Sequence, residues 1–546
     1  MSDRWDWLDT LELSPPDEFD RIVVSAGGRP ILRLAGDAAL VLAAAQRVNP
    51  RTIDAVTSSL GGRVAVEAAT ALLDAVGSDP AVVRSLERRP RRLQVEGPTA
   101  IRLTVVDPMR LLARAFPLHR LARSRATWGA LAVLTVIGMA GTGVLVLDPT
   151  SALHRPMDPY AYLGIAVLFT VVVILHELAH ALALIAHGGA SRRVGVMLFY
   201  FAPAFFCDVS DSWHLSRPER VIVALAGTLV QGAIGAALTL AALLGAPFAP
   251  LLAAVGLLCS VYVFANLLPF VKLDGYVALV GWLDHPNLRA HALVAVRRWA
   301  THVVAPSAPP VLPGSRGLVA FGAACAVTPV VLVTAVVSGL WSNVGHLQLG
   351  AIALLVIGAL LLAWVVVRVI RLARHLVRVG AAPARVLPAA LVVAGIAAAV
   401  LTVPIATSVR GGYTAEPSPS FVALGPVVAE PGSRVTVFAP GLLPGARLGD
   451  GVIAGGPEPC TVPVESIAPV DLPGVPVDAE CWPVEVNLAG VTRGVAILET
   501  PPTSILDRIG ALVDTALART VHADPATPNP SALPPREPDK RETSRG

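Results

Sequence analysis

Long runs of apolar residues dominate the middle of the chain. They lie at about 127–147, 161–186, 221–246, 251–272, 317–340, 348–370 and 386–408. Each is close to the roughly 20 apolar residues that one helix needs to cross a bilayer. The pattern therefore predicts a polytopic α-helical membrane protein with about seven spans. Residues 127–285 would form its core and residues 286–409 would contribute additional transmembrane helices.

Before the first run, apolar and polar positions alternate over short stretches, which is typical of a small soluble domain. After an N-terminal segment at 1–19, two strands are expected at Ile22–Val24 and Ile31–Leu34, on either side of the Gly27-Gly28 turn. Three helices are expected next, at about 38–46, 51–60 and 64–76. This order predicts a winged-helix-like domain over residues 20–92, joined to the first span by a basic linker at 93–126.

The chain after the last run changes character again. Residues 410–523 are rich in Val, Pro and Gly, which predicts short strands in a β-rich domain, and Ile505–Leu517 predicts one amphipathic helix. Residues 524–546 are rich in Pro, Ser, Arg and Glu and predict a disordered tail.

Composition and charge support a membrane protein. The chain has 546 residues, of which 54% are hydrophobic and only 15% charged, whereas a soluble enzyme carries about a quarter charged residues. Basic residues follow the even-numbered runs: Arg192, Arg193, Arg217, Arg220, Arg289, Arg297, Arg298, Arg368, Arg371, Arg374 and Arg378. By the positive-inside rule, the N-terminus is then cytoplasmic and the C-terminal domain extracytoplasmic in a bacterial, multi-pass cell-membrane protein.

Two further features of the composition bear on partners and compartment. The sequence has no basic patch interleaved with aromatic residues of the kind that indicates nucleic-acid binding, so no nucleic-acid partner is expected. Cys460 and Cys481 lie together in the polar C-terminal region. A disulfide between them is plausible if that region faces an oxidising compartment, as the charge pattern predicts.

The second apolar run carries an HExxH motif, His176-Glu177-Leu178-Ala179-His180. Positions i and i+4 share one helix face, so both imidazoles can ligate one Zn²⁺, while the glutamate can reach a water beside it. Composition alone would produce this pattern about one time in a hundred. A polar cluster satisfied between packed helices is the structural alternative. Two histidines and a glutamate inside a membrane-spanning helix cost free energy unless they are paired, bound to a metal or in contact with a water-filled cavity.

A catalytic zinc usually takes three protein ligands, so a third is expected at the same depth. The fourth run ends in Asn266-Leu-Leu-Pro269-Phe-Val-Lys-Leu-Asp274-Gly275. Taken alone, the last two residues read as a turn at a helix end. Beside the HExxH motif, Asp274 becomes the best candidate for the third metal ligand.

The two motifs together resemble the site-2 protease family of intramembrane zinc metalloproteases. The resemblance covers roughly residues 160–285. It implies that His176, His180 and Asp274 hold Zn²⁺ and that Glu177 is the catalytic acid/base. It also implies that Asn266 binds the substrate backbone. Departures are small: Ala179 stands where the family often has Gly, and Gly227-Thr228 where Gly-Pro is common.

Residues 194–211 are apolar, contain a proline and are too short to span, which predicts a membrane-dipping hairpin or loop that could gate the site. The stretch Phe199–Trp213 resembles the peptide zinc metalloprotease branch linked to biosynthesis of ribosomal peptides (RiPPs), including daptide-type ones. Asp208 and Asp211 within it read as solvated turn residues. The branch implies a membrane-associated or precursor peptide as substrate, and an ABC transporter or RiPP enzymes as candidate partners. The N-terminal domain resembles PqqD-like domains, which bind leader peptides, although a generic helical domain has the same pattern.

Two other functions fit the same sequence. A regulatory site-2 protease that cleaves a membrane-anchored anti-sigma factor would use the same chemistry. A non-proteolytic peptide transporter or immunity protein could keep a metal site without proteolysis. The presence of all four catalytic groups disfavours the second alternative.

Overall fold

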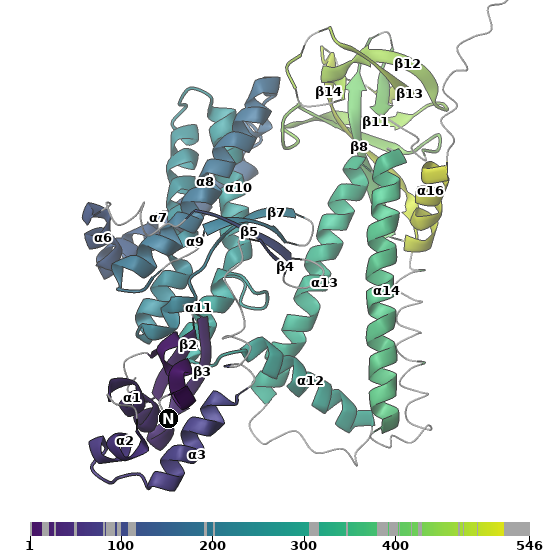
Figure 1. The fold of residues 1–546 in the computed structure, drawn as a ribbon. Coiled ribbons are helices and arrows are strands. Elements are labelled where there is room, and N and C mark those ends of the chain that lie inside the picture. The colour runs from purple at the N-terminus through teal and green to yellow at the C-terminus, as the bar shows by residue number, and fades with distance from the viewer. Residues whose placement is uncertain are drawn as a thin grey trace, which may run out of the picture.

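A computed structural model shows a helical core with a small domain at each end (Figure 1). The structure describes residues 3–13, 21–26, 29–48, 52–79, 82, 93–95, 100–106, 116–190, 194–199, 202–304, 316–344, 348–378, 391, 402, 405–416, 418–423, 429–467, 470–472, 474–486, 488 and 490–517. The tail predicted at 524–546 lies outside the described residues.

The N-terminal domain has the expected order of strands followed by three helices. Its elements are η1 (Asp3–Thr10), β1 (Leu11–Leu13), β2 (Arg21–Ala26), β3 (Arg29–Ala35), α1 (Gly36–Arg47), α2 (Ile53–Ser59) and α3 (Val66–Gly77). The three strands form one antiparallel sheet in the order β1-β2-β3. Trp5, Leu8 and Leu11 lie in the same buried core as Leu42 and Leu73. Residues Trp5, Leu8 and Leu11 are therefore part of this core, although the sequence pattern places the domain only from residue 20.

The helical core begins at α6 (Phe116–Arg123) and contains α7 (Arg125–Leu147), η2 (Ala152–His154), α8 (Pro159–Ala186), α9 (Arg217–Leu243) and α10 (Ala249–Leu267). Of these, α7, α8, α9 and α10 are long and apolar enough to cross a membrane. Asp158 caps α8, because its carboxylate accepts a hydrogen bond from the backbone N–H of Tyr160 at 2.7 Å. The helix then continues without a break through the HExxH motif.

Small residues let these helices pack closely. Gly138 on α7 faces Ala236 on α9, and a Cβ at Gly138 would lie 2.6 Å from the Ala236 Cα. Gly235 on α9 makes the same close approach to Cys259 on α10. In a bilayer, such small-residue contacts replace the hydrophobic driving force that water would provide.

A four-stranded antiparallel sheet lies beside α8 and α9 (Figure 1). Its order is β4 (Leu93–Val95), β5 (Ala100–Val106), β6 (Val194–Phe199) and β7 (Ala202–Cys207). The hairpin expected within 194–211 is therefore present as β6 and β7. Its partner β5 lies in the segment expected to be a basic linker, and so does α6. β5 and β6 are about ninety residues apart in the sequence, and the apolar pattern does not predict that they pair.

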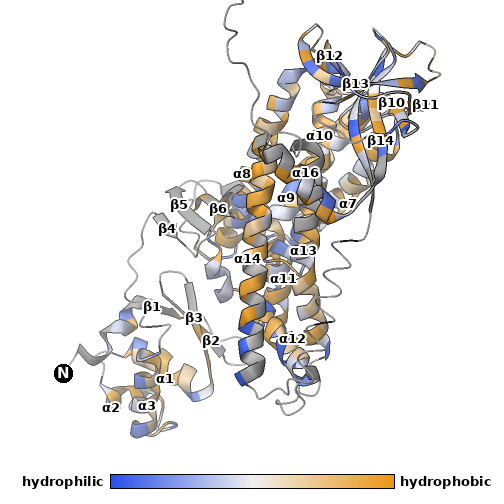
Figure 2. Ribbon diagram, turned by 90° about the vertical axis from the view of Figure 1, so that its right-hand side faces the viewer, coloured by the Kyte–Doolittle hydropathy of each residue, from blue (hydrophilic) through white to orange (hydrophobic). Residues whose placement is uncertain are grey.

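The remaining helices are α11 (Asp274–Leu283), α12 (Leu288–Val304), α13 (Arg316–Val344) and α14 (Gln348–Arg378). The last two are helices of 29 and 31 residues at the fifth and sixth apolar runs. Almost all of the seventh run lies outside the described residues, and its end overlaps the first strand of the C-terminal domain. Figure 2 shows hydrophobic residues along α13 and α14, in contrast to the mixed colouring of the two terminal domains.

The C-terminal region is β-rich, as expected. A seven-stranded sheet has the order β11-β10-β14-β8-β9-β13-β12. Its strands are β8 (Ile405–Thr414), β9 (Ser420–Ala423), β10 (Arg434–Phe438), β11 (Arg447–Ile453), β12 (Glu458–Pro463), β13 (Pro476–Val486) and β14 (Arg493–Thr503). A disulfide joins Cys460 on β12 to Cys481 on β13. Helix α16 (Ile505–Leu517) packs Leu512 against Ala351 and Leu354 of α14.

The two terminal domains lie at opposite ends of the helical core (Figure 1). The β domain contacts the connection between α7 and α8: the backbone N–H of Leu443 donates to the carbonyl of Leu153 at 3.1 Å. The N-terminal domain contacts η3 (Ser210–His214), the connection between β7 and α9, where Ser25 Oγ lies 2.8 Å from His214 Nε2. Whichever face each domain occupies in a cell, the two lie at opposite ends of the candidate spans.

Candidate metal centre

The two histidines of the HExxH motif lie buried on one face of α8. His176 is 3% exposed and His180 6% exposed. Their Nε2 atoms are 3.2 Å apart, so both rings turn the same nitrogen toward one point. The i, i+4 spacing on an unbroken helix produces this arrangement, as the sequence predicts.

The third residue reaches the same point from a break between two helices. Helix α10 ends at Leu267, and after six residues α11 begins at Asp274. Gly275 lets the two helices approach at the break, because a Cβ there would lie 2.9 Å from the Asn266 carbonyl oxygen and clash with the Leu267 backbone. The fourth apolar run is therefore a shorter helix followed by a turn, which places a carboxylate at the depth of the histidines.

The three side chains form a compact set of possible ligands. Asp274 Oδ2 lies 3.2 Å from His176 Nε2 and 3.3 Å from His180 Nε2. The three ligand atoms lie within 4.8 Å of one another, and no other group of three such residues is found among the described residues. Two imidazoles and one carboxylate are a donor set typical of catalytic zinc, which keeps a fourth position for water or substrate.

Contacts from α9 fix the orientation of two of these ligands. His180 Nδ1 donates to the Val223 carbonyl at 2.7 Å, which leaves its Nε2 as an acceptor that faces the centre. Thr228 Oγ1 donates to Asp274 Oδ2 at 2.6 Å. Partners of this kind hold metal-binding side chains in the correct tautomer and direction. The hydrogen bond to Asp274 therefore gives Thr228 a structural role at the centre.

Gly227 provides the space for the imidazoles. A Cβ at this position would lie 2.7 Å from His176 Nε2 and closer still to His180 Nε2. Any side chain at Gly227 would therefore enter the point on which the ligand atoms converge. The open backbone of α9 at Gly227 and the donor set together fit a metal ion.

Glu177 lies next to the first histidine and contacts the hairpin. Its carboxylate lies near the backbone of Cys207, the last residue of β7. The ring of Tyr262 on α10 packs edge-on against His176, with centroids 5.9 Å apart. The glutamate therefore lies between the histidine pair and the end of an edge strand.

Two buried nitrogens at the site have no hydrogen-bond partner within the described part of the chain: His176 Nδ1 and Asn266 Nδ2. An unsatisfied buried polar group costs about 1–3 kcal/mol. Asn266 is 5% exposed and lies at the end of α10, next to the break that carries Asp274. Its amide is a donor that a substrate carbonyl or a water could satisfy.

A buried ion pair joins the start of α9 to the end of α11, the helix that begins with Asp274. Arg220 at the start of α9 donates to Asp284 Oδ1 at 2.7 Å, just beyond the end of α11. The Arg220 guanidinium also lies 5.2 Å from the centre of the Trp213 ring. In the sequence, Arg220 appears only as a topology signal, because no local pattern shows that it faces Asp284.

The structure brings His176, Glu177, His180 and Asp274 together, and it leaves Asp208 in a turn, whereas Asp211 is not the solvated turn residue that was expected but a largely buried link between η3 and the segment after α8. Asp208 accepts a hydrogen bond from the backbone N–H of Ser210. Asp211 accepts one from Ala190 at 2.6 Å and lies 3.5 Å from His214. Val223 carries no sequence signal, and Thr228 stands out in the sequence only as a departure from the family pattern; their contacts to His180 and Asp274 come from a third helix, α9.

Comparison with known proteins supports a metalloprotease-like region. A protein of Bacillus subtilis (strain 168) named "Putative peptide zinc metalloprotease protein YydH" is 32% identical over 121 residues. These residues make up 22% of this chain and 48% of that protein, so the chain spans about half the length of the curated relative it matches. No family model matches the chain. No solved structure matches it either.

Proposed function

We propose that this protein is an intramembrane zinc metalloprotease of the site-2 type. The observation that carries the proposal is the convergence of His176, His180 and Asp274 beside Glu177, within helices apolar enough to cross a membrane. Charged and metal-binding groups are costly at such a depth and mark functional sites. The similarity to a protein named as a peptide zinc metalloprotease supports the same conclusion.

The chemistry follows from the placement of each side chain. A zinc ion held by the two histidines and Asp274 would polarise the scissile carbonyl and lower the pKa of a water. Glu177 accepts the proton of the attacking water and passes it to the leaving amine. Asn266 donates its amide hydrogen to the substrate backbone, which satisfies a buried nitrogen that has no partner among the described residues.

The hairpin supplies a way to hold an extended substrate. β7 is one edge strand of its sheet as described, and its last residue, Cys207, lies near the carboxylate of Glu177. A peptide that pairs with an edge strand is extended, with its carbonyls exposed between side chains. An unwound segment added at β7 would therefore reach the carboxylate of Glu177 with a scissile carbonyl accessible.

The N-terminal domain favours a peptide as the substrate. Its strands and three helices have the order of PqqD-like domains, and Ser25 on β2 contacts His214 in the connection that follows β7. A leader-bearing precursor held on this domain would be delivered next to the hairpin. We infer that the substrate is a membrane-associated or precursor peptide of RiPP (daptide-type) maturation, with the N-terminus cytoplasmic and the β domain extracytoplasmic.

Mapping of new peptide N-termini tests this function. Membranes of the native host with the wild-type chain would be compared with membranes that contain Glu177→Gln, which keeps the metal ligands and the size of the side chain. We expect cleavage products that require Glu177 and disappear on chelation, and their parent to be a small precursor peptide. An anti-sigma factor as the parent would favour the regulatory alternative. Identical N-termini in both samples would contradict proteolysis.

A further inference from the structure

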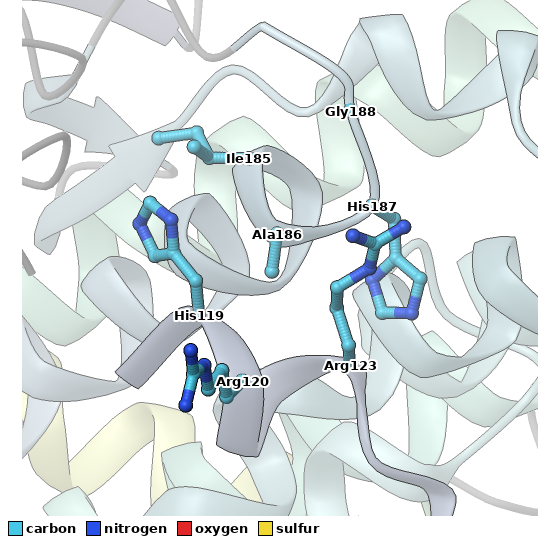
Figure 3. A pocket seen from close by; sticks show the side chains of 7 residues that line it. All are labelled: His119, Arg120, Arg123, Ile185, Ala186, His187 and Gly188. Atoms are coloured by element: carbon cyan, nitrogen blue, oxygen red, sulfur yellow. The ribbon is translucent and has the colours of Figure 1, made fainter. Parts of the chain in front are cut away.

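A cavity of about 430 Å³ lies away from the metal centre, where α6 meets the end of α8. Its lining residues are His119, Arg120, Arg123, Ile185, Ala186, His187 and Gly188, shown in Figure 3. Two arginines and two histidines line this space, and none of the described residues that line it is acidic. A cavity with this lining favours an anion that can accept several hydrogen bonds, such as a phosphate.

The walls of the cavity are held by packing. Ala122 of α6 lies in one buried cluster with Ala183 and Ala186 of α8. The indole N–H of Trp128 on α7 donates to the Ala122 carbonyl at 2.8 Å, which fixes the corner between α6 and α7. Arg120 and Arg123 are therefore presented to the end of α8 by a fixed helix.

The C-terminal end of α8 adjoins this cavity. The last carbonyls of a helix normally lack partners and carry a partial negative charge. Here the His187 backbone N–H bonds to the carbonyls of Ala183 and Leu184, and the two glycines that follow bond to those of Ile185 and Leu184. His187 Nδ1 also donates to Ala183 at 2.8 Å. These bonds cap the helix end that adjoins the arginines.

The cavity lies at the level where two candidate spans end. Helix α7 begins at Arg125, directly after α6, and α8 ends at Ala186. Leu118 and Leu121 of α6 are 47% and 55% exposed, three residues apart on one face. A short helix with exposed leucines on one face and arginines on another is typical of the membrane interface. The leucines would face acyl chains while the arginines face headgroups.

We propose that this cavity binds the phosphate of an anionic phospholipid headgroup. Basic pockets between helices at the membrane surface recognise such headgroups. Arg120 and Arg123 bind the phosphate oxygens, and the exposed leucines of α6 lie along the acyl chains. The bound lipid thereby ties α6 to the end of the helix that carries His176 and His180. Lipid binding at this site would not require the protein to be a protease.

Native mass spectrometry of the purified full-length protein in detergent tests this site. The protein is titrated with phosphatidylglycerol, with phosphatidylcholine and with inorganic phosphate, as wild type and as Arg120→Gln/Arg123→Gln. Because each basic residue near the membrane surface contributes about 1 kcal/mol, or roughly fivefold in affinity, we expect phosphatidylglycerol to bind about 30-fold more weakly to the double variant. Arg120→Lys/Arg123→Lys keeps both charges and should retain most of the affinity.

A matched control is available on α14. Arg374 and Arg378 are exposed arginines one turn apart, and Arg374→Gln/Arg378→Gln makes the same change in net charge. This control should bind phosphatidylglycerol like the wild type. Equal losses in both double variants, or unchanged affinity in Arg120→Gln/Arg123→Gln, would overturn the proposal. Tight binding of inorganic phosphate that displaces the lipid would show a site for a soluble anion and would overturn it as well.

Discussion

Thr228 on α9 donates its hydroxyl hydrogen to Asp274 Oδ2 at 2.6 Å, the same oxygen that faces His176 and His180. The hydroxyl thus holds one carboxylate oxygen toward the histidines. This bond joins α9 to the first turn of α11, across the break that follows α10. The geometry of the proposed metal site therefore depends on three helices.

Removal of this hydroxyl should weaken metal binding without removing a ligand. Thr228 is fully buried, so Thr228→Val preserves its shape and leaves Asp274 without the hydrogen bond. We expect the zinc dissociation constant to rise about 10- to 100-fold, as for other contacts that orient a ligand. Competition with a chromogenic chelator measures it. Thr228→Ser keeps the hydroxyl and should bind zinc like the wild type; equal affinity in all three proteins would contradict this role.

A single methyl group at Gly227 should abolish the site. The new Cβ would lie 2.7 Å from His176 Nε2, well inside van der Waals contact. We expect Gly227→Ala to lose zinc and activity while the protein remains folded, as judged by gel filtration and circular dichroism. The matched control is Gly129→Ala on α7, where a Cβ would have no neighbour within 4 Å. Full zinc occupancy in Gly227→Ala would show that the imidazoles do not converge at α9.

The buried pair of Arg220 and Asp284 should stabilise the fold around α11. Both side chains are almost fully buried, and loss of Arg220 leaves the Asp284 carboxylate with only the longer contact to Arg217, at 3.7 Å. Arg220→Gln should therefore destabilise the protein by about 3–5 kcal/mol. Thermal unfolding in detergent measures the effect. Arg220→Gln/Asp284→Asn removes both charges and should recover part of the lost stability; a double variant less stable than either single variant would contradict a simple charge pair.

The disulfide should stabilise the β domain by restricting its unfolded chain. Cys460 and Cys481 are separated by 21 residues, and closure of such a loop contributes about 3 kcal/mol. We expect Cys460→Ser/Cys481→Ser to make the β domain more sensitive to trypsin in the full-length protein. A Cys207→Ser variant changes a thiol that forms no disulfide and serves as the control. Equal digestion rates would contradict a stabilising role.

Local patterns in the sequence predicted much of this structure. Helical spacing placed the two histidines on one face of α8, and the strands and three helices of the N-terminal domain lie close to their expected bounds. The apolar runs also predicted the mostly helical core, and the frequent turns predicted the β-rich C-terminal region. These features depend on residues that are near one another in the chain, so their periodicity is visible without a structure.

Features that join distant segments were not predictable in this way. β5 pairs with β6 although more than eighty residues separate them, and both strands are short. Trp5 and Leu8 belong to a core whose helices begin at residue 36. Thr228 reaches Asp274 from another helix. Such pairs follow from tertiary packing, which leaves no periodic pattern. The orientation in the membrane and the full count of seven spans remain predictions.

Zinc content of purified proteins tests the central claim most directly. Wild type, Glu177→Gln and Asp274→Ala would be purified in parallel without added chelator, and zinc per chain would be measured by mass spectrometry of the digested protein. We expect close to one zinc per chain in the wild type and in Glu177→Gln, because the glutamate is not a ligand, and a large loss in Asp274→Ala. Equal zinc content in wild type and Asp274→Ala, or no zinc in any of the three, would contradict the proposed metal centre.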